Sequence, residues 1–172
     1  MNIGLLGFGV VGGGVWELAQ ENRALNVKKV LVRREAPSLG KAAVQDVEAI
    51  LRDTEIDTVV EVLGGLHPAY EWICRALAAG KDVVTANKAV ISAYYRELTA
   101  LAHENGAALR CTAAVGGGIP WLTNLEKAAR ANHISRVWGI LNGTTNYILT
   151  QMIHNGVTLS LIHISEPTRL GM

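Results

Sequence analysis

The chain has 172 residues, of which 49% are hydrophobic, so it is long enough to bury a core and too apolar to be disordered. Sixteen basic and fifteen acidic residues give a net charge of +1, with neither the basic block typical of nucleic-acid binding nor an acidic tail. We therefore expect a globular protein without a nucleic-acid partner, whose ligands are selected by local features.

The two cysteines, Cys74 and Cys111, form neither a CxxC pair nor a zinc-ligand spacing with the five histidines. We predict buried free thiols, which fit a reducing, cytoplasmic location. The apolar start lacks the basic region of a signal peptide, and no uninterrupted run of about 18 apolar residues predicts a membrane span. We therefore expect no membrane partner.

Short apolar runs alternate with longer amphipathic segments along the chain. This alternation predicts an α/β fold, in which a doubly wound parallel sheet carries helices on both faces. The expected strands are Asn2–Leu6, Val27–Val32, Thr58–Leu63, Asp82–Thr85 and Ala108–Thr112, and the expected helices are Gly12–Ala24, Pro68–Ala79 and Ser92–Asn105.

The first expected strand is followed directly by GFGVVG, which opens the first helix. In a Rossmann-like turn of this kind the first glycine permits a tight turn, the second admits the pyrophosphate of a dinucleotide, and the third lets helix and strand pack closely. The helix N-terminus then offers free N–H groups to the phosphates. The predicted cofactor contacts in this turn are Gly7, Phe8, Gly9, Val10, Val11 and Gly12.

The end of the second strand indicates which dinucleotide binds. The sequence there is VLVRRE, so Arg33 and Arg34 precede Glu35. A guanidinium at this point favours the 2'-phosphate of NADP, whereas a carboxylate favours the ribose hydroxyls of NAD. We predict a preference for NADP(H), and NAD(H) with Glu35 on the ribose remains the alternative.

Four further stretches follow the glycine turn in an order and spacing that resemble homoserine dehydrogenase, and the resemblance covers residues 2 to about 158. It implies NAD(P)-dependent interconversion of L-homoserine and L-aspartate 4-semialdehyde, on the route to threonine, methionine and isoleucine. It also implies a homodimer when full length, a nucleotide-binding domain in residues 1–130, and the start of a truncated α+β catalytic domain in residues 131–158. The stretches are VVEVLGG (59–65), TANKAVIS (85–92), AAVGGGIP (113–120) and GILNGTTNYIL (139–149).

Lys88 in TANK follows an expected strand, so it lies at the carboxyl edge of the sheet, where open α/β folds bind ligands. An ammonium there can hold a ribose hydroxyl, a substrate oxygen or a developing alkoxide. We predict a supporting catalytic role for Lys88, although a surface lysine that begins a helix is the alternative. Gly64 and Thr85 complete the predicted cofactor contacts.

Two further turns carry the substrate and metal predictions. The loop VGGGIP leaves backbone carbonyls outside regular structure, and the resemblance implies a monovalent cation such as Na+ bound by the carbonyls of Val115, Gly117 and Ile119. Thr112 stands where the family often has a glutamate, so a structural loop is the alternative. The turn NGTTNY is expected to end a strand and start a helix, and the resemblance implies that Gly143 and Thr144 bind the substrate.

The ending LSLIHISEPTR, residues 159–169, is identical to a translation of a common transposon-end sequencing adapter. We expect residues 159–172 to be an artefactual tail, with authentic sequence ending near Thr158. The family's principal acid, base and ammonium-binding residues lie beyond the NGTTNY helix, so we expect an inactive fragment. The alternatives are a semialdehyde or dihydrodipicolinate reductase relative, which should lack the NGTTNY turn, and a non-catalytic nucleotide-sensing domain.

Overall fold

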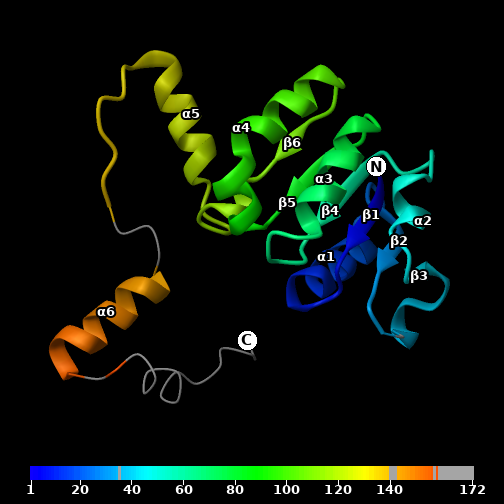
Figure 1. Cartoon of the computed structure of the whole chain (residues 1–172), viewed down its shortest axis with the longest axis horizontal. Coiled ribbons are helices and arrows are strands. Elements are labelled where there is room, and N and C mark those ends of the chain that lie inside the picture. The colour runs from blue at the N-terminus through cyan, green and yellow to red at the C-terminus, as the bar shows by residue number, and fades with distance from the viewer. Residues whose placement is uncertain (35, 140–142, 157, 159–172) are drawn as a thin grey trace. The chain divides into compact units, whose positions relative to one another are not determined.

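The computed structural model of the chain describes residues 1–34, 36–139, 143–156 and 158 (Figure 1). The chain divides into two compact units, Met1–Leu125 and a second unit that begins at Glu126. This division lies inside a helix, five residues before the domain boundary expected from the sequence. The expected adapter tail, residues 159–172, lies outside the described residues and stays a prediction.

The first unit is a parallel sheet with helical connections (Figure 1). Its elements are β1 (Asn2–Leu6), α1 (Val10–Glu21), β2 (Asn26–Leu31), the 3-10 helix η1 (Pro37–Ala42), β3 (Ala43–Val44), α2 (Glu48–Leu51), β4 (Thr58–Glu61), α3 (Ala69–Ala78), β5 (Asp82–Thr85), α4 (Lys88–Glu104), β6 (Leu109–Arg110), the 3-10 helix η2 (Thr112–Ala114) and the start of α5 (Trp121–Ala131).

The strand order in the sheet is β3-β2-β1-β4-β5-β6, and each neighbouring pair is parallel. The chain therefore moves outward in one direction from β1 to β3 and in the other from β4 to β6. Such a reversal between β1 and β4 opens a crevice at the carboxyl ends of these two strands. The predicted α/β, Rossmann-like, doubly wound fold is confirmed.

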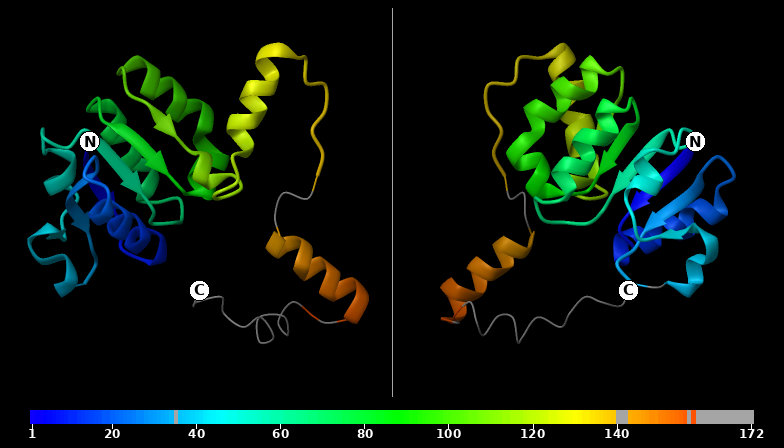
Figure 2. Two further views of the ribbon diagram at one scale, coloured as in Figure 1. Left: turned by 180° about the vertical axis from the view of Figure 1, so that it is seen from behind. Right: turned by 45° about the vertical axis from the view of Figure 1, so that its right-hand side comes forward.

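Two hydrophobic clusters fill the two faces of the sheet, because successive strand side chains point to opposite sides. Ile3 and Leu5 pack with Ala19 of α1, whereas Leu6 packs with residues of α2, α3 and α4. Figure 2 shows the helices arranged on both sides of the sheet. The buried strands hold the loops at their carboxyl ends on a rigid base.

At two positions where the structure differs from the sequence-based boundaries, a side chain accepts hydrogen bonds from backbone N–H groups. The strand expected to run to Leu63 ends at Glu61, because the Leu63 N–H donates to the Glu61 carboxylate instead of a neighbouring strand. The helix expected from Ser92 begins at Lys88, because the Asn87 side chain accepts from the N–H groups of Ala89 and Val90. Such N-caps fix where a helix starts.

In the second unit, α6 (Gly143–Asn155) contains the predicted helix. The strand expected before it does not form in residues 133–139, and residues 140–142 lie outside the described part of the chain. A strand requires a hydrogen-bonded neighbour, and none pairs with these residues in the described chain. No helix among the described residues is long and apolar enough to cross a membrane.

Candidate functional site

The turn between β1 and α1 requires glycine at two positions. Gly7 has a φ of 106°, a conformation that side-chain-bearing residues rarely adopt. A Cβ on Gly12 would lie 2.3 Å from the carbonyl oxygen of Gly7, so any side chain there would push the helix away from the strand. These two glycines bring the N-terminus of α1 directly over the end of β1.

Gly9 is different, because nothing in the described structure requires a glycine there. It is the N-cap residue of α1, its φ of −93° suits any residue, and a Cβ would meet no atom within 4 Å. No side chain of the described residues caps this helix end, so the first N–H groups of α1 have no side-chain acceptor there. Free N–H groups and the positive end of the helix dipole suit a phosphate group.

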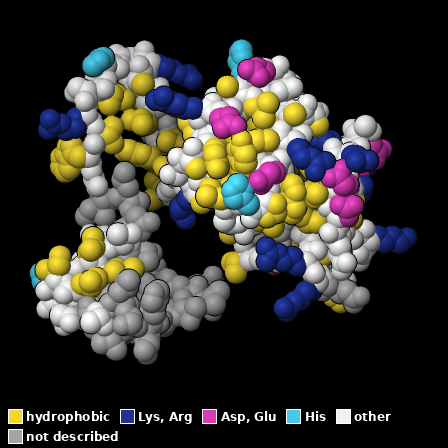
Figure 3. Space-filling view, in the orientation of Figure 1, with side chains coloured by type: hydrophobic (Ala, Val, Ile, Leu, Met, Phe, Trp, Pro, Cys, Tyr) yellow, Lys and Arg dark blue, Asp and Glu magenta, His cyan; other side chains and the backbone are white. Residues whose placement is uncertain are grey.

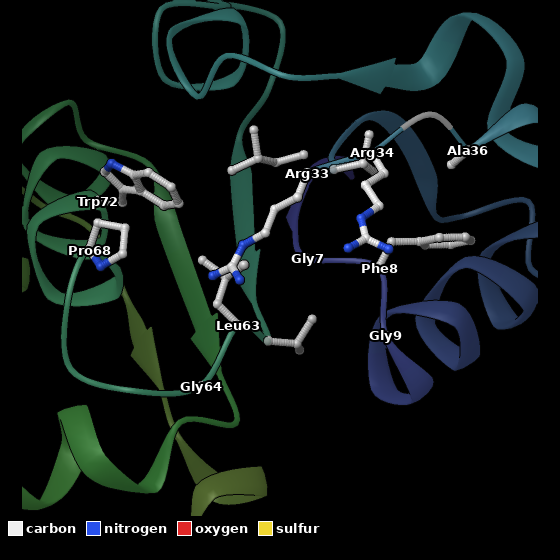
Figure 4. A pocket seen from close by; sticks show the side chains of 13 residues that line it. Gly7, Phe8, Gly9, Arg33, Arg34, Ala36, Leu63, Gly64, Pro68 and Trp72 are labelled. Carbon is white, nitrogen blue, oxygen red and sulfur yellow. The ribbon is translucent and has the colours of Figure 1, made fainter.

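A cleft of about 650 Å³ extends from this turn across the carboxyl ends of β2 and β4. Figure 4 shows the side chains of Arg33 and Arg34 entering it from the end of β2, while Pro68 and Trp72 come from the opposite wall at α3. The structure thus brings the glycine turn and both arginines to one cleft. Glu35 lies outside the described residues.

A second cleft of about 340 Å³ continues along the same edge of the sheet toward α4. It shares Val62, Leu63 and Gly64 with the first cleft, and it is lined in addition by Val11, Gly65, Ala86, Asn87, Lys88 and Ala89. The two clefts together form a groove along the carboxyl edge of the sheet. We call the part at Arg33 and Arg34 the arginine end and the part at Lys88 the lysine end.

Lys88 lies at the lysine end as the first residue of α4 and is exposed. Its ammonium has no hydrogen-bond or ion-pair partner in the described residues. Thr85 is placed differently, because its side chain is fully buried and its hydroxyl donates to Glu61 at 2.6 Å. The Thr85 hydroxyl therefore supports the groove from below and does not line it.

The loop expected to bind a cation folds into tight turns. Its N–H groups at Val115 and Ile119 donate to the carbonyls of Thr112 and Gly116, at 3.1 Å each. The Ile119 carbonyl accepts from Trp121 N–H at 2.7 Å, so one of the three expected ligand oxygens already has a donor. In the described residues no group of three or more His, Cys, Asp or Glu side chains suits a metal ion.

The expected substrate residues belong to the second unit. Gly143 is the first residue of α6, and Thr144 follows in the same turn. Their side-chain environment lies outside what the structure describes. The other expected substrate-turn residue, Asn142, also falls outside the described residues.

Several residues that line the groove or lie beneath it were not predicted from the sequence. Pro68 and Trp72 lie at the start of α3, and Glu61 and Asn87 connect the two strand ends. The signal for Glu61 was an acidic residue inside the apolar run TVVEVL, where a carboxylate is costly unless it is hydrogen-bonded. The position of Trp72 at the cleft depends on how α3 packs on the sheet, and no pattern in the sequence indicates it.

The sheet order, the glycine turn and the groove at the switch point define a dinucleotide-binding domain of the Rossmann class. Comparison with known families narrows this class. Residues 7–112 match the family described as homoserine dehydrogenase, NAD binding domain, and residues 120–171 match the family described as homoserine dehydrogenase. The second match extends into the residues that we expect to be adapter-derived.

Individual relatives agree with the family matches. The chain is 43% identical to a homoserine dehydrogenase of Synechocystis sp. over 91% of its own length and 39% of the relative. A crystal structure of a homoserine dehydrogenase from Thiobacillus denitrificans matches with a TM-score of 0.82 at 38% identity, covering 91% of this chain and 39% of that one. A hyperthermophilic archaeal homoserine dehydrogenase in complex with NADPH matches with a TM-score of 0.79 at 28% identity, covering 95% of this chain and 59% of that one.

The chain belongs to the homoserine dehydrogenase family. This confirms the resemblance carried by the four sequence stretches and sets aside the reductase alternative. The chain spans 39% of the length of curated relatives from Synechocystis sp. and Bacillus subtilis.

Proposed function

We propose that this chain forms the cofactor-binding part of a homoserine dehydrogenase that prefers NADP(H) to NAD(H). The observation that carries the proposal is that Arg33 and Arg34 line the same cleft as the glycine turn. With the pyrophosphate at the N-terminus of α1, the adenosine ribose lies toward the end of β2, where both guanidinium groups are within reach. The similar archaeal enzyme in complex with NADPH supports this assignment.

The cofactor preference is tested by titrating the chain with NADPH and NADH. Charge-assisted hydrogen bonds to a 2'-phosphate contribute roughly 1.5 to 3 kcal/mol, so we expect at least about tenfold tighter binding of NADPH. The Arg33→Ala, Arg34→Ala double variant should lose this preference and keep its NADH affinity. Arg23→Ala, a change of an exposed arginine outside the cleft, is the control. Equal affinities in the unchanged chain would disprove the preference.

The remaining roles extend along the groove and into the second unit. The bound nicotinamide supplies hydride acceptance and donation to the reaction. Lys88 would hold an oxygen of the cofactor or substrate at the lysine end, and Gly143 and Thr144 would bind homoserine. The carbonyls of Val115, Gly117 and Ile119 remain our proposed Na+ ligands. A cytoplasmic, homodimeric full-length enzyme of threonine, methionine and isoleucine biosynthesis completes the proposal.

Oxidation of homoserine requires a proton acceptor at the substrate hydroxyl as well as a cofactor. The only candidate in the described groove is Lys88, to which we assign a supporting role. We therefore expect the 172-residue chain to bind NADP(H) without turning over homoserine, which is measured by following NADPH formation by absorbance. The same chain joined to the downstream half of a related enzyme should be active. Robust turnover by the 172-residue chain alone would refute the assignment of Lys88.

A further inference from the structure

The side chain of Glu61, the last residue of β4, is fully buried. No lysine, arginine or histidine of the described residues forms an ion pair with it. A buried carboxylate without a cation is costly unless hydrogen bonds satisfy it. Three donors do so here: Leu63 N–H and Asn87 Nδ2 donate to Oε1 at 2.8 and 3.3 Å, and the Thr85 hydroxyl donates to Oε2 at 2.6 Å.

These donors belong to two separate walls of the groove. Leu63 lies in the loop after β4, which lines both clefts, whereas Thr85 ends β5 and Asn87 lies in the turn between β5 and α4. Asn87 extends the connection, because its Nδ2 also donates to the Gly65 carbonyl at 2.7 Å. Its Oδ1 caps α4, the helix that begins with Lys88.

The sheet itself does not need this carboxylate. Backbone pairing already aligns Glu61 with Thr85 in neighbouring strands, and the Ala86 N–H donates to the Glu61 carbonyl at 3.2 Å. The three donors to the carboxylate lie at the strand ends or beyond them, and removal of the carboxylate would leave all three without this acceptor. The carboxylate therefore serves the loops beyond the strands, where it fixes the spacing of the two walls.

We propose that Glu61 is a positioning residue that holds the lysine end of the groove in the geometry that binds the nicotinamide half of the cofactor. The inference rests on the proposed function, because it assumes that NADP(H) occupies the groove with its adenosine half at the arginine end. A preformed wall lowers the ordering cost of binding. Loss of Glu61 should therefore weaken contacts to the nicotinamide half and leave those to the adenosine half intact.

The experiment compares two ligands on the 172-residue chain and on its Glu61→Gln variant. NADPH spans the whole groove, whereas adenosine 2',5'-bisphosphate reaches the arginine end alone. Glutamine has the shape of glutamate, but its amide NH2 group replaces one of the two acceptor oxygens. This NH2 group would face the N–H and O–H groups that donate to Glu61. We expect the variant to bind NADPH about tenfold more weakly. Its affinity for adenosine 2',5'-bisphosphate should not change.

Two sets of variants complete the test. Glu55→Gln changes an exposed acid that pairs with Lys28 away from the groove, and it should alter neither affinity. Thr85→Val removes the hydroxyl that donates to Glu61 and should reproduce the selective loss of NADPH affinity, while Thr85→Ser should restore it. The Thr85 variants decide the question if circular dichroism shows that Glu61→Gln does not fold.

The possible outcomes separate the positioning role from the proposed function. Equal weakening of both ligands, or no weakening of NADPH, would overturn the positioning role and leave the cofactor site standing. An unchanged chain that binds adenosine 2',5'-bisphosphate as tightly as NADPH would also overturn it, because the lysine end would then contribute nothing to binding. Failure of the unchanged chain to bind either ligand would instead overturn the proposed function.

Discussion

At the scale of single residues, the three glycines of the GFGVVG turn have different physical roles. Gly7 is required by its positive φ and Gly12 by its close approach to the Gly7 carbonyl, so both are needed for folding. Gly9 has an ordinary backbone conformation and open space around its Cβ position. We therefore predict that glycine is needed here for the ligand, whose pyrophosphate must approach the backbone closely.

This difference yields a prediction. Gly9→Val should fold as the unchanged chain does, with the same circular dichroism spectrum and thermal midpoint, yet bind NADPH at least about tenfold more weakly because the side chain occupies the phosphate position. Gly12→Ala is the matched comparison, and it should lower the thermal midpoint because its Cβ would lie 2.3 Å from the Gly7 carbonyl oxygen. Undiminished NADPH affinity in Gly9→Val would mean that the phosphates lie elsewhere.

At the scale of elements, the amino-terminal edge of the sheet is held by charged groups that do not line the groove. Lys81 is buried and donates to the carbonyls of Asp53 and Ile56 at 2.6 Å each. Asp57 accepts from the N–H of Asn2 at the start of β1, at 2.9 Å. That hydrogen bond is the main reason why the pKa of the Asp57 carboxyl lies below its usual value of 3.8.

The lowered pKa of Asp57 predicts how stability changes in acid. A carboxyl whose pKa is lower in the folded state contributes stability that is complete above its unfolded pKa, near 3.8, and is lost as pH falls through the folded pKa. Asp57→Asn should therefore be less stable than the unchanged chain near neutral pH and approach it below the folded pKa. Urea denaturation at a series of pH values measures this difference, with Glu17→Gln as a control of an exposed helix residue. If the stability difference between the two chains were the same at every pH, the proposed link between Asp57 ionisation and folding would be contradicted.

The sequence predicted the elements with long, strongly patterned segments. The bounds of β1 and β5 match the prediction. Of the residues predicted as cofactor contacts, four of the glycine turn, both arginines and Lys88 line the groove, whereas Val10 and Gly12 line neither cleft. The segment from η1 to α2 was missed, because elements of two to six residues show no full period of hydrophobic residues. Glu61 and Asn87 were missed as site residues because their roles depend on strands that are adjacent in the sheet and separated in the sequence.

At the scale of the whole molecule, the two units differ in how densely they expose large apolar side chains. The first unit buries two hydrophobic clusters and exposes large apolar side chains at scattered positions, whereas the described residues after Ala131 expose as many within a much shorter stretch (Figure 3). The exposed side chains of the first unit are Met1, Val10, Val11, Leu18, Leu66, Tyr95 and Ile119. Trp138 is 87% exposed and Ile153 is 76% exposed. Apolar surface of this kind favours association between molecules. The exposed side chains after Ala131 are Ile134, Val137, Trp138, Tyr147, Leu149, Met152 and Ile153.

The cofactor groove and this apolar surface can therefore be separated. Every residue that lines the groove lies between Gly7 and Ala89, so a shortened chain of residues 1–131 retains the whole groove and ends with α5. We expect it to bind NADPH with the affinity of the 172-residue chain. We also expect it to stay monodisperse at concentrations where the longer chain associates, since it lacks the large exposed side chains that the structure describes after Ala131.

Calorimetric titration and light scattering on the two chains measure these expectations side by side. A third chain of 172 residues that carries Trp138→Ser and Ile153→Ser provides the control for length, and it should reduce association without changing NADPH affinity. Weaker NADPH binding by residues 1–131 would show that the second unit contributes to the cofactor site. Equal association of all three chains would show that the first unit, whose exposed Val10, Val11 and Leu18 lie on α1, carries the associating surface instead.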